Sequence, residues 1–238
     1  LKGLDMDYGH DLVFGAFITP SAGDPQAPVA LAQLAEASGL DLVTFQDHPY
    51  QPSFLDTWTL MSYVAAATER VHIAPNVLNV PLRPPAVLAG AAASLDLLSG
   101  GRVDLGLGAG GFWDAIAAMG VAKLTPGEAV TALEEAIRII RARWDTTQRG
   151  GVFLDGTTHS AHGAKRGPRP AHEIPIWLGA RKPRMLALVG RAADGWLPSL
   201  PWLEPGDYGR GNDRIDEAAA GVGRDPRSIR RLLNIGPS

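Results

Sequence analysis

Short apolar runs alternate along most of the chain with longer segments rich in alanine and leucine. Residues 42–45 are apolar, β-branched or aromatic over a length too short for a helix, which is typical of a buried strand. Residues 28–38 keep apolar positions over a helical length and are followed by Gly39, a residue type that commonly ends helices. The same patterns predict strands at 12–18, 42–45, 71–74, 103–107, 174–178, 195–198 and 230–235, and helices at 28–38, 55–68, 85–98, 113–119, 126–144, 183–192 and 208–221.

The order of these elements predicts the fold class. Nearly every strand is followed by a helix, which fits an α/β protein with parallel strands. Residues 145–172 interrupt the alternation because they are polar and lack apolar periodicity, so they predict an exposed insertion with a short hairpin around 152–158. We therefore predict a single domain over residues 1–238, a (β/α)8 TIM barrel that lacks its last βα unit, with the insertion at about 145–172.

An open doubly wound sheet is the alternative fold. Such sheets often carry Gly-x-Gly-x-x-Gly at the start of a helix, and residues 106–111, followed by Phe112 and Trp113, fit that pattern only loosely. The chain also stops at residues 235–238, directly after a predicted strand. A barrel needs an eighth strand to pair the edges of its first and seventh strands, so the expectation is a fragment or a barrel completed by another segment.

Composition narrows the range of partners. With 22 basic and 25 acidic residues, the formal net charge of −3 favours neither nucleic acid nor an anionic membrane as partner. The absence of cysteine excludes disulfides, thiolate nucleophiles and cysteine-ligated metals, and it fits a reducing compartment. No apolar run reaches the roughly 18 residues of a membrane span, and residues 1–11 contain three aspartates where a signal peptide would be basic and apolar. The expectation is a cytoplasmic protein with a small-molecule partner.

Polar residues gather where predicted strands end. Asp47 and His48 directly follow the strand at 42–45. In a parallel α/β fold such positions meet at one edge, where ligands bind. A histidine there can pass a proton near neutral pH, and an adjacent carboxylate can bias its charge. Because Asp and His before Pro49 also suit a simple loop cap, both interpretations stay open.

Two loops offer backbone amides to a ligand. Ala109, Gly110 and Gly111 follow the strand at 103–107, and their small side chains suit close approach by a planar or anionic group. Residues 179–182 precede Pro183, which begins a helix, so free amides and two cations there suit a phosphate. The alternatives are tight βα turns for the first loop and solvated cations for the second.

The remaining polar candidates carry weaker signals. His159, His162 and His172 lie in the insertion without the spacing of a zinc site, so we predict that they are solvated or line a lid, and no metal is predicted. Arg83 suits a helix-start anchor as well as a ligand contact. Asp96 lies on an apolar helix with no basic partner nearby in sequence, so no nucleophile is assigned there.

Several strings of residues resemble the luciferase-like monooxygenase superfamily, and they follow one another in order as far as Arg231. The strings are QDHPYQP at 46–52, PNVLNVPLRPP at 75–85, AASLDLLSGGR at 92–102, WLGA at 177–180 and RAADGW at 191–196. The resemblance implies a TIM barrel that binds FMN or the deazaflavin F420 at the carboxyl ends of its strands. The Asp47–His48 pair is most similar to the F420-dependent branch, which implies hydride transfer between F420 and a small organic substrate.

The resemblance also implies roles for single residues. His48 would lie beside the ring carbon that exchanges hydride, as proton donor or acceptor, with Asp47 tuning it or bonding the cofactor. Asn76–Val77 would be a non-proline cis peptide that forms a bulge behind the ring. The residues implied to hold the rest of the cofactor are Ala109, Gly110, Gly111, Gly179, Ala180, Arg181 and Lys182.

Two departures and two alternatives accompany the resemblance. Gly111 and Pro52 stand where the sugar-phosphate-oxidising members carry an acid and an aromatic, which argues against a glucose-6-phosphate type of mechanism. An FMN-dependent monooxygenase would need the same barrel, and a cofactor-binding protein without turnover would fit an incomplete one. Homodimers are usual in the superfamily, so a homodimer is expected.

Overall fold

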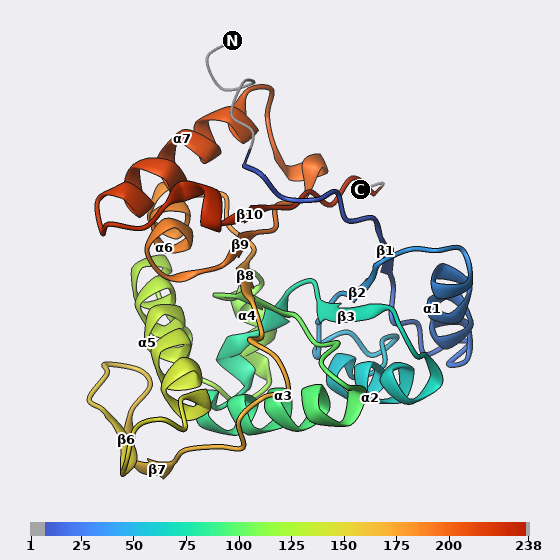
Figure 1. Ribbon diagram of the computed structural model, residues 1–238, viewed down its shortest axis with the longest axis horizontal. Helices are drawn as coiled ribbons and strands as arrows, with labels where there is room; N and C mark the ends of the chain where they lie inside the picture. Colours follow the sequence, from blue (N-terminus) through green and yellow to red (C-terminus); the bar gives the residue numbers. More distant parts are fainter. Residues whose placement is uncertain (1–7, 237–238) are drawn as a thin grey trace. The chain divides into compact units, whose positions relative to one another are not determined.

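The computed structural model describes residues 8–236, which fall into two units (Figure 1). The larger unit is Phe14–Ile174, and the other contains residues 8–13 and 175–236 of the described chain. Each unit has parallel strands and helices of its own. The residues expected beside the cofactor ring, which we call the ring site, are Asp47, His48, Asn76 and Val77, and all of them lie in the larger unit. The loop 179–182 lies in the other unit.

The larger unit begins with a three-stranded parallel sheet, β1 (Gly15–Ile18), β2 (Leu42–Phe45) and β3 (His72–Pro75). Val43 of β2 lies beside Ala16 on one side and Ile73 on the other. Helices α1 (Ala27–Ala37) and α2 (Thr57–Ala67) pack against these strands (Figure 1). All four residues of β2 are buried, which explains their unbroken apolar and β-branched pattern.

A second parallel pair follows in the same unit. After Pro75 the chain bends at Asn76–Val77 and resumes as β4 (Leu78–Asn79), which pairs with β5 (Leu105–Gly108). The short 3-10 helix η1 (Val80–Leu82) and the helix α3 (Pro85–Ser99) connect the two strands. A bridge between Ile73 and Val103 aligns the entry to β5 with β3. The carboxyl ends of β2, β4 and β5 therefore carry the candidate residues.

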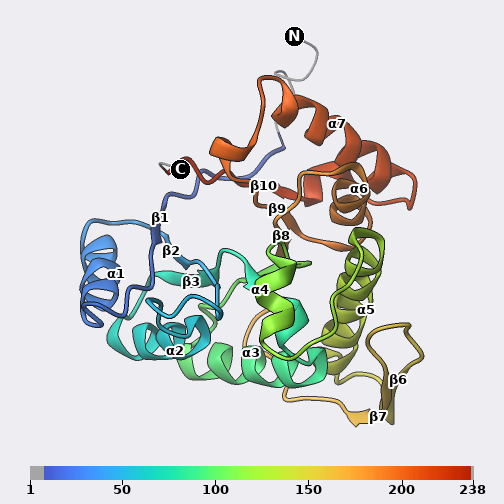
Figure 2. The same ribbon diagram turned by 180° about the vertical axis from the view of Figure 1, so that it is seen from behind.

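Two further helices and a hairpin complete the larger unit. Helix α4 (Trp113–Ala118) follows β5, and α5 (Pro126–Trp144) begins with a capping box in which Thr125 and Glu128 bond each other's backbone amides. Helices α3 and α5 lie side by side (Figure 2). The strands β6 (Gly151–Leu154) and β7 (Ala161–Lys165) form an antiparallel hairpin that contacts α5.

The other unit has three parallel strands, β8 (Ile176–Leu178), β9 (Gly195–Trp196) and β10 (Arg230–Arg231). Helix α6 (Pro183–Ala192) connects β8 to β9, and it packs against α7 (Asp207–Ala220). The short helices η2 (Leu200–Trp202) and η3 (Pro226–Ser228) flank α7. Trp196 is buried in this unit, and its indole N–H donates to the Ala180 carbonyl at 2.9 Å.

The predicted elements are confirmed in order and type, with shifted ends. The ranges predicted for α5 and α6 are those observed, and β3 lies close to the predicted strand at 71–74, whereas β4 was not among the predicted strands. The hairpin prediction at 152–158 was too narrow, because that range covers only β6 and the turn after it. The last predicted strand was too long, since β10 ends at Arg231. Among the helices of residues 8–236, none has the length and apolarity to cross a membrane.

Candidate active site

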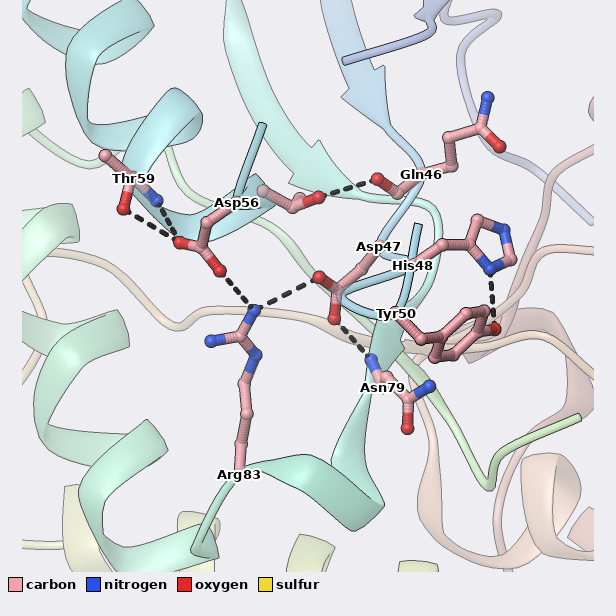
Figure 3. A network of polar contacts seen from close by, with 9 residues as sticks. Gln46, Asp47, His48, Tyr50, Asp56, Thr59, Asn79 and Arg83 are labelled. Atoms are coloured by element: carbon pink, nitrogen blue, oxygen red, sulfur yellow. Dashed lines mark hydrogen bonds and ion pairs between the residues drawn. The ribbon is translucent and has the colours of Figure 1, made fainter. Parts of the chain in front are cut away.

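Asp47 is a buried anchor and both of its carboxylate oxygens are in use (Figure 3). It follows β2 and is 3% exposed. Its Oδ2 accepts the backbone N–H of Asn79 at 2.7 Å, and its Oδ1 accepts the Arg83 guanidinium at 3.1 Å. Since charge-assisted hydrogen bonds to a buried carboxylate are strong, Asp47 ties the ends of β2 and β4 together. It therefore positions its neighbours.

Arg83 extends this network to helix α2. The same guanidinium nitrogen that bonds Asp47 donates to Asp56 at 3.1 Å (Figure 3). Asp56 caps α2 by accepting the Thr59 N–H at 2.8 Å. Burial acts to raise the pKa of Asp56, but the hydrogen bonds from Thr59 and Arg83 hold that pKa below its ordinary value. Arg83 thus anchors Asp47 and the start of α2, and a ligand contact of Arg83 stays a prediction.

His48 is half-buried and pairs with Tyr50. Its Nδ1 lies 2.7 Å from the Tyr50 hydroxyl. Burial lowers the pKa of His48, and the nearby Asp47 charge only partly opposes this. Burial also raises the pKa of Tyr50, so its hydroxyl keeps its proton. In the neutral tautomer with the proton on Nδ1, the ring donates to the Tyr50 hydroxyl oxygen and Nε2 is free to accept a proton. His48 is then an uncharged imidazole near neutral pH.

A cavity of about 320 Å³ opens beside His48. Aromatic rings form much of its wall, with Phe112 at 5.6 Å and Phe54 at 6.2 Å from the His48 ring, both edge to face. Gln46 contributes an amide to the same wall, although its Nε2 donates to Thr19 at 3.0 Å. The volume and the mostly apolar lining suit a planar organic ligand.

The peptide bond between Asn76 and Val77 is cis, as the resemblance implies. The Asn76 N–H donates to the Phe45 carbonyl at 2.7 Å, which fixes the bulge beside the end of β2. Two glycines of β5 make room for the bulge. A Cβ on Gly106 would clash with the Pro75 carbonyl oxygen, and one on Gly108 would lie 2.7 Å from Val77 Cγ2. These glycines thus have a packing reason that the sequence pattern did not show.

The predicted loop after β5 contains glycines of two kinds. Gly110 has a φ of +92°, and a Cβ there would meet Ile116, Pro81 and Trp113 at 3.1 Å. A Cβ on Gly111 would meet nothing within 4 Å. Gly110 is therefore needed for the turn, as the alternative interpretation had it, whereas the backbone at Gly111 is accessible. Whether Ala109, Gly110 and Gly111 contact a cofactor stays a prediction.

Two residues of this site, Asn79 and Arg83, have a buried side-chain atom that no described residue hydrogen-bonds, Oδ1 of Asn79 and Nε of Arg83. Asn79 ends β4, is 6% exposed, and its backbone N–H is bonded to Asp47. Its side-chain Oδ1 is buried, and no residue of the described chain donates to it. A buried acceptor without a donor costs about 1–3 kcal/mol. Such an atom, a few bonds from an anchored backbone, suits a ligand N–H.

The predicted phosphate loop is described within its own unit. Arg181 and Lys182 are both exposed, and Lys182 is the N-cap of α6, which begins at Pro183. The Arg181 guanidinium lies 5.3 Å from the Trp202 ring centroid, a cation–π distance. Ala180 is buried and its carbonyl is occupied by Trp196. The loop presents two cations and a helix start to solvent, and its phosphate role stays a prediction.

The structure changes the interpretation of two weaker candidates. Asp96 does have a basic partner, since its Oδ1 lies 2.8 Å from His172 Nδ1, and Asp96 itself is fully buried. His172 is therefore bonded, where a solvated or lid position was predicted. This pair ties the end of the insertion to α3 and offers no nucleophile. Among residues 8–236, no group of three or more His, Asp or Glu could hold a metal ion.

Sequence reasoning missed Tyr50, Asn79 and Phe112 as site residues. Tyr50 lies two positions after His48, a spacing at which a turn brings side chains together, so it could have been proposed. Asn79 ends β4, a strand that was not predicted because it resumes only after the bend at Asn76–Val77. The contact of Phe112 with His48 joins two distant loops, and no local pattern indicates it.

Known proteins resemble this chain over most of its length. Residues 6–238 match the family described as Luciferase-like monooxygenase. The chain belongs to this family. The 5,10-methylenetetrahydromethanopterin reductase of Methanolobus tindarius is 33% identical over 221 residues, which cover 92% of this chain and 63% of the relative. The chain thus spans less than two thirds of that relative's length.

Solved structures agree on the fold. An F420-dependent secondary alcohol dehydrogenase in complex with an F420-acetone adduct superposes with a TM-score of 0.82 at 22% identity, covering 92% of this chain and 67% of that one. The oxygenating constituent of 3,6-diketocamphane monooxygenase from Pseudomonas putida, in complex with FMN, gives 0.76 at 19% identity, covering 94% and 67%. The predicted α/β fold of the luciferase-like TIM-barrel type is confirmed. The structures that this chain resembles thus include both an F420-dependent protein and an FMN-containing one.

Proposed function

We propose that this protein transfers hydride between coenzyme F420 and a small organic substrate. The observation that carries the proposal is the buried Asn79 Oδ1 without a donor among the described residues. The backbone of Asn79 is bonded to the carboxylate of Asp47, the residue before the neutral His48. A deazaflavin ring carries an N–H that the Asn79 Oδ1 can accept, and the cavity lined by His48 and Phe112 has the size and apolar character for the ring system. The Asp47–His48 pair and the F420-dependent relatives favour F420 over FMN.

In the proposed reaction the protein itself accepts or donates a proton of the substrate. F420 when bound would give or take the hydride at its ring. His48, uncharged near neutral pH, can accept the hydroxyl proton of an alcohol as that alcohol is oxidised, and the protonated imidazole can return a proton when a carbonyl is reduced. Tyr50 holds the ring orientation through Nδ1, which leaves Nε2 for the substrate. Asp47 and Arg83 position these groups without touching the reacting atoms.

The charged end of the cofactor needs a separate contact. Arg181 and Lys182 at the start of α6 are the cations predicted for it, and both are exposed. A helix N-terminus with adjacent cations binds phosphate through free amides and charge. Arg181 and Lys182 are therefore proposed to bind the cofactor's phosphate, and salt should weaken this contribution.

Substitution of Asn79 tests the ring site. Asn79→Leu keeps the side-chain size and removes Oδ1, so we expect F420 to bind about tenfold more weakly, the equivalent of about 1.4 kcal/mol for a lost hydrogen bond. Fluorescence titration of F420 measures this dissociation constant. The matched control is Asn234→Leu, whose amide donates to Ser199 in the other unit. An unchanged dissociation constant for Asn79→Leu would remove the amide from the site and the main support from the proposal.

FMN is the second candidate, because an FMN-containing monooxygenase shares the fold. Its ring also carries an N–H that Asn79 could accept. Under that alternative the reduced flavin would react with oxygen, and oxygen consumption by the protein with reduced FMN would support it.

A further inference from the structure

Two histidines lie edge to face near the beginning of β5, at the opposite end of that strand from Asn79. The ring centroids of His72 and His172 are 6.2 Å apart, and the ring planes are at 89° to each other. His72 begins β3 and contacts Asp104, which directly precedes β5. Asn79 pairs with Gly108 at the other end of β5. Both histidines belong to the larger unit, and the proposed hydride transfer uses neither of them.

Backbone hydrogen bonds set the positions of both histidines. The carbonyl of Ile73 accepts the Asp104 N–H at 3.1 Å, which places the start of β3, with His72, beside Asp104. The backbone N–H of His172 donates to the Asp96 carboxylate of α3 at 3.1 Å. This bond fixes the segment before β8 against the last turns of that helix. The two rings are therefore brought together by three elements that are distant in the sequence.

Each ring has a buried carboxylate bonded to its Nδ1. The Nδ1 of His72 lies 3.1 Å from Asp104, and that of His172 lies 2.8 Å from Asp96. Both aspartates are buried. Since an ionised carboxylate only accepts hydrogen bonds, Nδ1 carries the proton in each neutral ring and Nε2 carries the lone pair. A carboxylate that holds Nδ1 in this way is the usual partner of a histidine that binds metal through Nε2, and the arrangement occurs here twice.

Access and charge at this pair suit a cation. The side chains of His72 and His172 are 43% and 32% exposed, so an ion can reach them from solvent. The carboxylates of Asp96 and Asp104 place two negative charges behind the rings. Arg102 is a nearby cation, but its guanidinium is bonded to carbonyl oxygens at the end of α2 and before β3. The two carboxylates therefore outweigh the one guanidinium, and the local charge favours a divalent cation.

We propose that His72 and His172 together bind one divalent transition-metal ion, of the class of Zn²⁺ and Ni²⁺, through their Nε2 atoms. Imidazole suits these ions, whereas Mg²⁺ and Ca²⁺ prefer oxygen ligands. With a Zn–N bond of about 2.1 Å, two rings that share an ion have centres up to about 6.4 Å apart, and about 5 Å apart at a tetrahedral angle. The observed 6.2 Å lies within this reach, and a small rotation of the rings gives the tetrahedral angle. The described chain offers no group of three or more His, Asp or Glu to a metal ion, so water completes the coordination.

The ion would join the start of β3 to the segment before β8. Because the two histidines come together only in the folded chain, an ion that binds both stabilises the folded state. The site is independent of the proposed hydride transfer, since it lies at the other end of β5 from Asn79. It stands or fails whether or not F420 binds.

Calorimetric titration of the metal-free protein with Zn²⁺, Ni²⁺ and Mg²⁺ tests the site. We expect Zn²⁺ and Ni²⁺ to bind and Mg²⁺ not to bind. His72→Gln and His172→Gln should each weaken Zn²⁺ binding at least tenfold, and the double variant should lose no more than either single one, because both side chains hold the same ion. Glutamine keeps an amide that can donate to the same carboxylate. Unchanged Zn²⁺ affinity in either single variant would overturn the proposal.

His162→Gln is the matched control for these variants. His162 also lies near a carboxylate, with its Nδ1 3.6 Å from Asp155, but its side chain is 69% exposed. We expect this substitution to leave Zn²⁺ affinity unchanged. Asp104→Asn keeps an acceptor for His72 and removes the charge behind it, so Zn²⁺ binding should weaken about tenfold. A loss of affinity in His162→Gln as large as in His72→Gln would also overturn the proposal.

A measurement on the unchanged protein does not depend on the folding of any variant. In isotope-labelled protein, Zn²⁺ should shift the Cε1 proton resonances of His72 and His172 together, with one common saturation curve. Saturating Zn²⁺ should also raise the free energy of unfolding. A shift of only one of the two resonances, or of neither, would overturn the shared site.

Discussion

At the scale of single residues, His48 is the group that we propose to transfer the proton. Burial lowers its pKa below the ordinary value of 6.5. In the direction of alcohol oxidation the neutral imidazole is the active form, so the rate of F420 reduction should rise as the pH passes upward through this lowered pKa and level off near neutrality. In His48→Gln this step should vanish and the rate should fall about 100-fold. Single-turnover absorbance measurements across pH record both effects.

Tyr50→Phe is the matched control for this prediction. It removes the 2.7 Å contact to Nδ1 while it keeps the aromatic ring. We expect a smaller loss of rate and a displaced but still present pH step. A pH step that survives in His48→Gln would assign the proton transfer to another group.

The sequence predicted those features of the site that depend on residues near one another in the chain. Asp47 and His48 come just after a strand, so the sequence predicted their place at its carboxyl end. The partners of Asp47 were not predicted, because Asn79 and Arg83 reach it only after the chain has bent at Asn76–Val77. The same holds for Asp96, whose partner His172 is 76 residues away. Local patterns place a residue on an element, whereas its partners depend on tertiary packing.

At the scale of elements, the bulge between β3 and β4 depends on glycine in the neighbouring strand. Gly108→Ala would place a methyl group 2.7 Å from Val77 Cγ2, so we expect a loss of stability of about 1–3 kcal/mol from overpacking. Val77→Ala removes that methyl contact, so the double variant should be more stable than the sum of the two single variants predicts. Chemical denaturation of the four proteins measures this coupling.

Gly111→Ala is the control for this cycle, because a Cβ at that position would meet nothing within 4 Å. We expect its stability to stay near that of the unchanged protein. Strict additivity of Gly108→Ala and Val77→Ala would mean that the two side chains do not share the space that the structure assigns to them.

Element boundaries were predicted best where end signals are strong. Thr125-Pro126 with Glu128 forms a capping box, and Pro183 starts α6, so both helices begin where the sequence indicates. The hairpin was placed too narrowly because Gly163 adopts a φ of +85° within β7, and a glycine in a strand reads as a turn. Strand β4 was not predicted, since it is only two residues long and resumes after the bend at Asn76–Val77.

At the scale of the whole molecule, pH acts on stability through a His–Asp pair of the larger unit. A hydrogen bond that His72 donates to the Asp104 carboxylate raises the pKa of His72, while burial and Arg102 oppose this rise and Asp96 supports it. The folded state thus holds this proton more tightly than the unfolded state. The pair's contribution is therefore complete below about pH 6.5 and is lost as the pH rises through the raised pKa.

The measurement is the free energy of unfolding of the unchanged protein and of His72→Gln at pH 5.5 and pH 8.5. The difference between the two proteins should be larger at the lower pH. It should be modest, because the His72 side chain is 43% exposed. His162→Gln is the control, since its partner Asp155 is 94% exposed and little pH effect is expected. A difference that grows with pH would contradict the assignment.

The fold class followed from the regular β-then-α order, and the family match over residues 6–238 agrees with it. The whole-chain pattern indicates the substrate and the cofactor only through resemblance. The central claim is that His48, Asn79 and their surroundings form an F420 site.

Parallel equilibrium titrations of the protein with F420 and with FMN test that claim most directly. Cofactor fluorescence at low and moderate salt gives both dissociation constants. The account predicts that F420 binds more tightly than FMN, that added salt weakens its binding, and that Asn79→Leu weakens it further. Tighter binding of FMN, or binding of F420 that Asn79→Leu leaves unchanged, would contradict it.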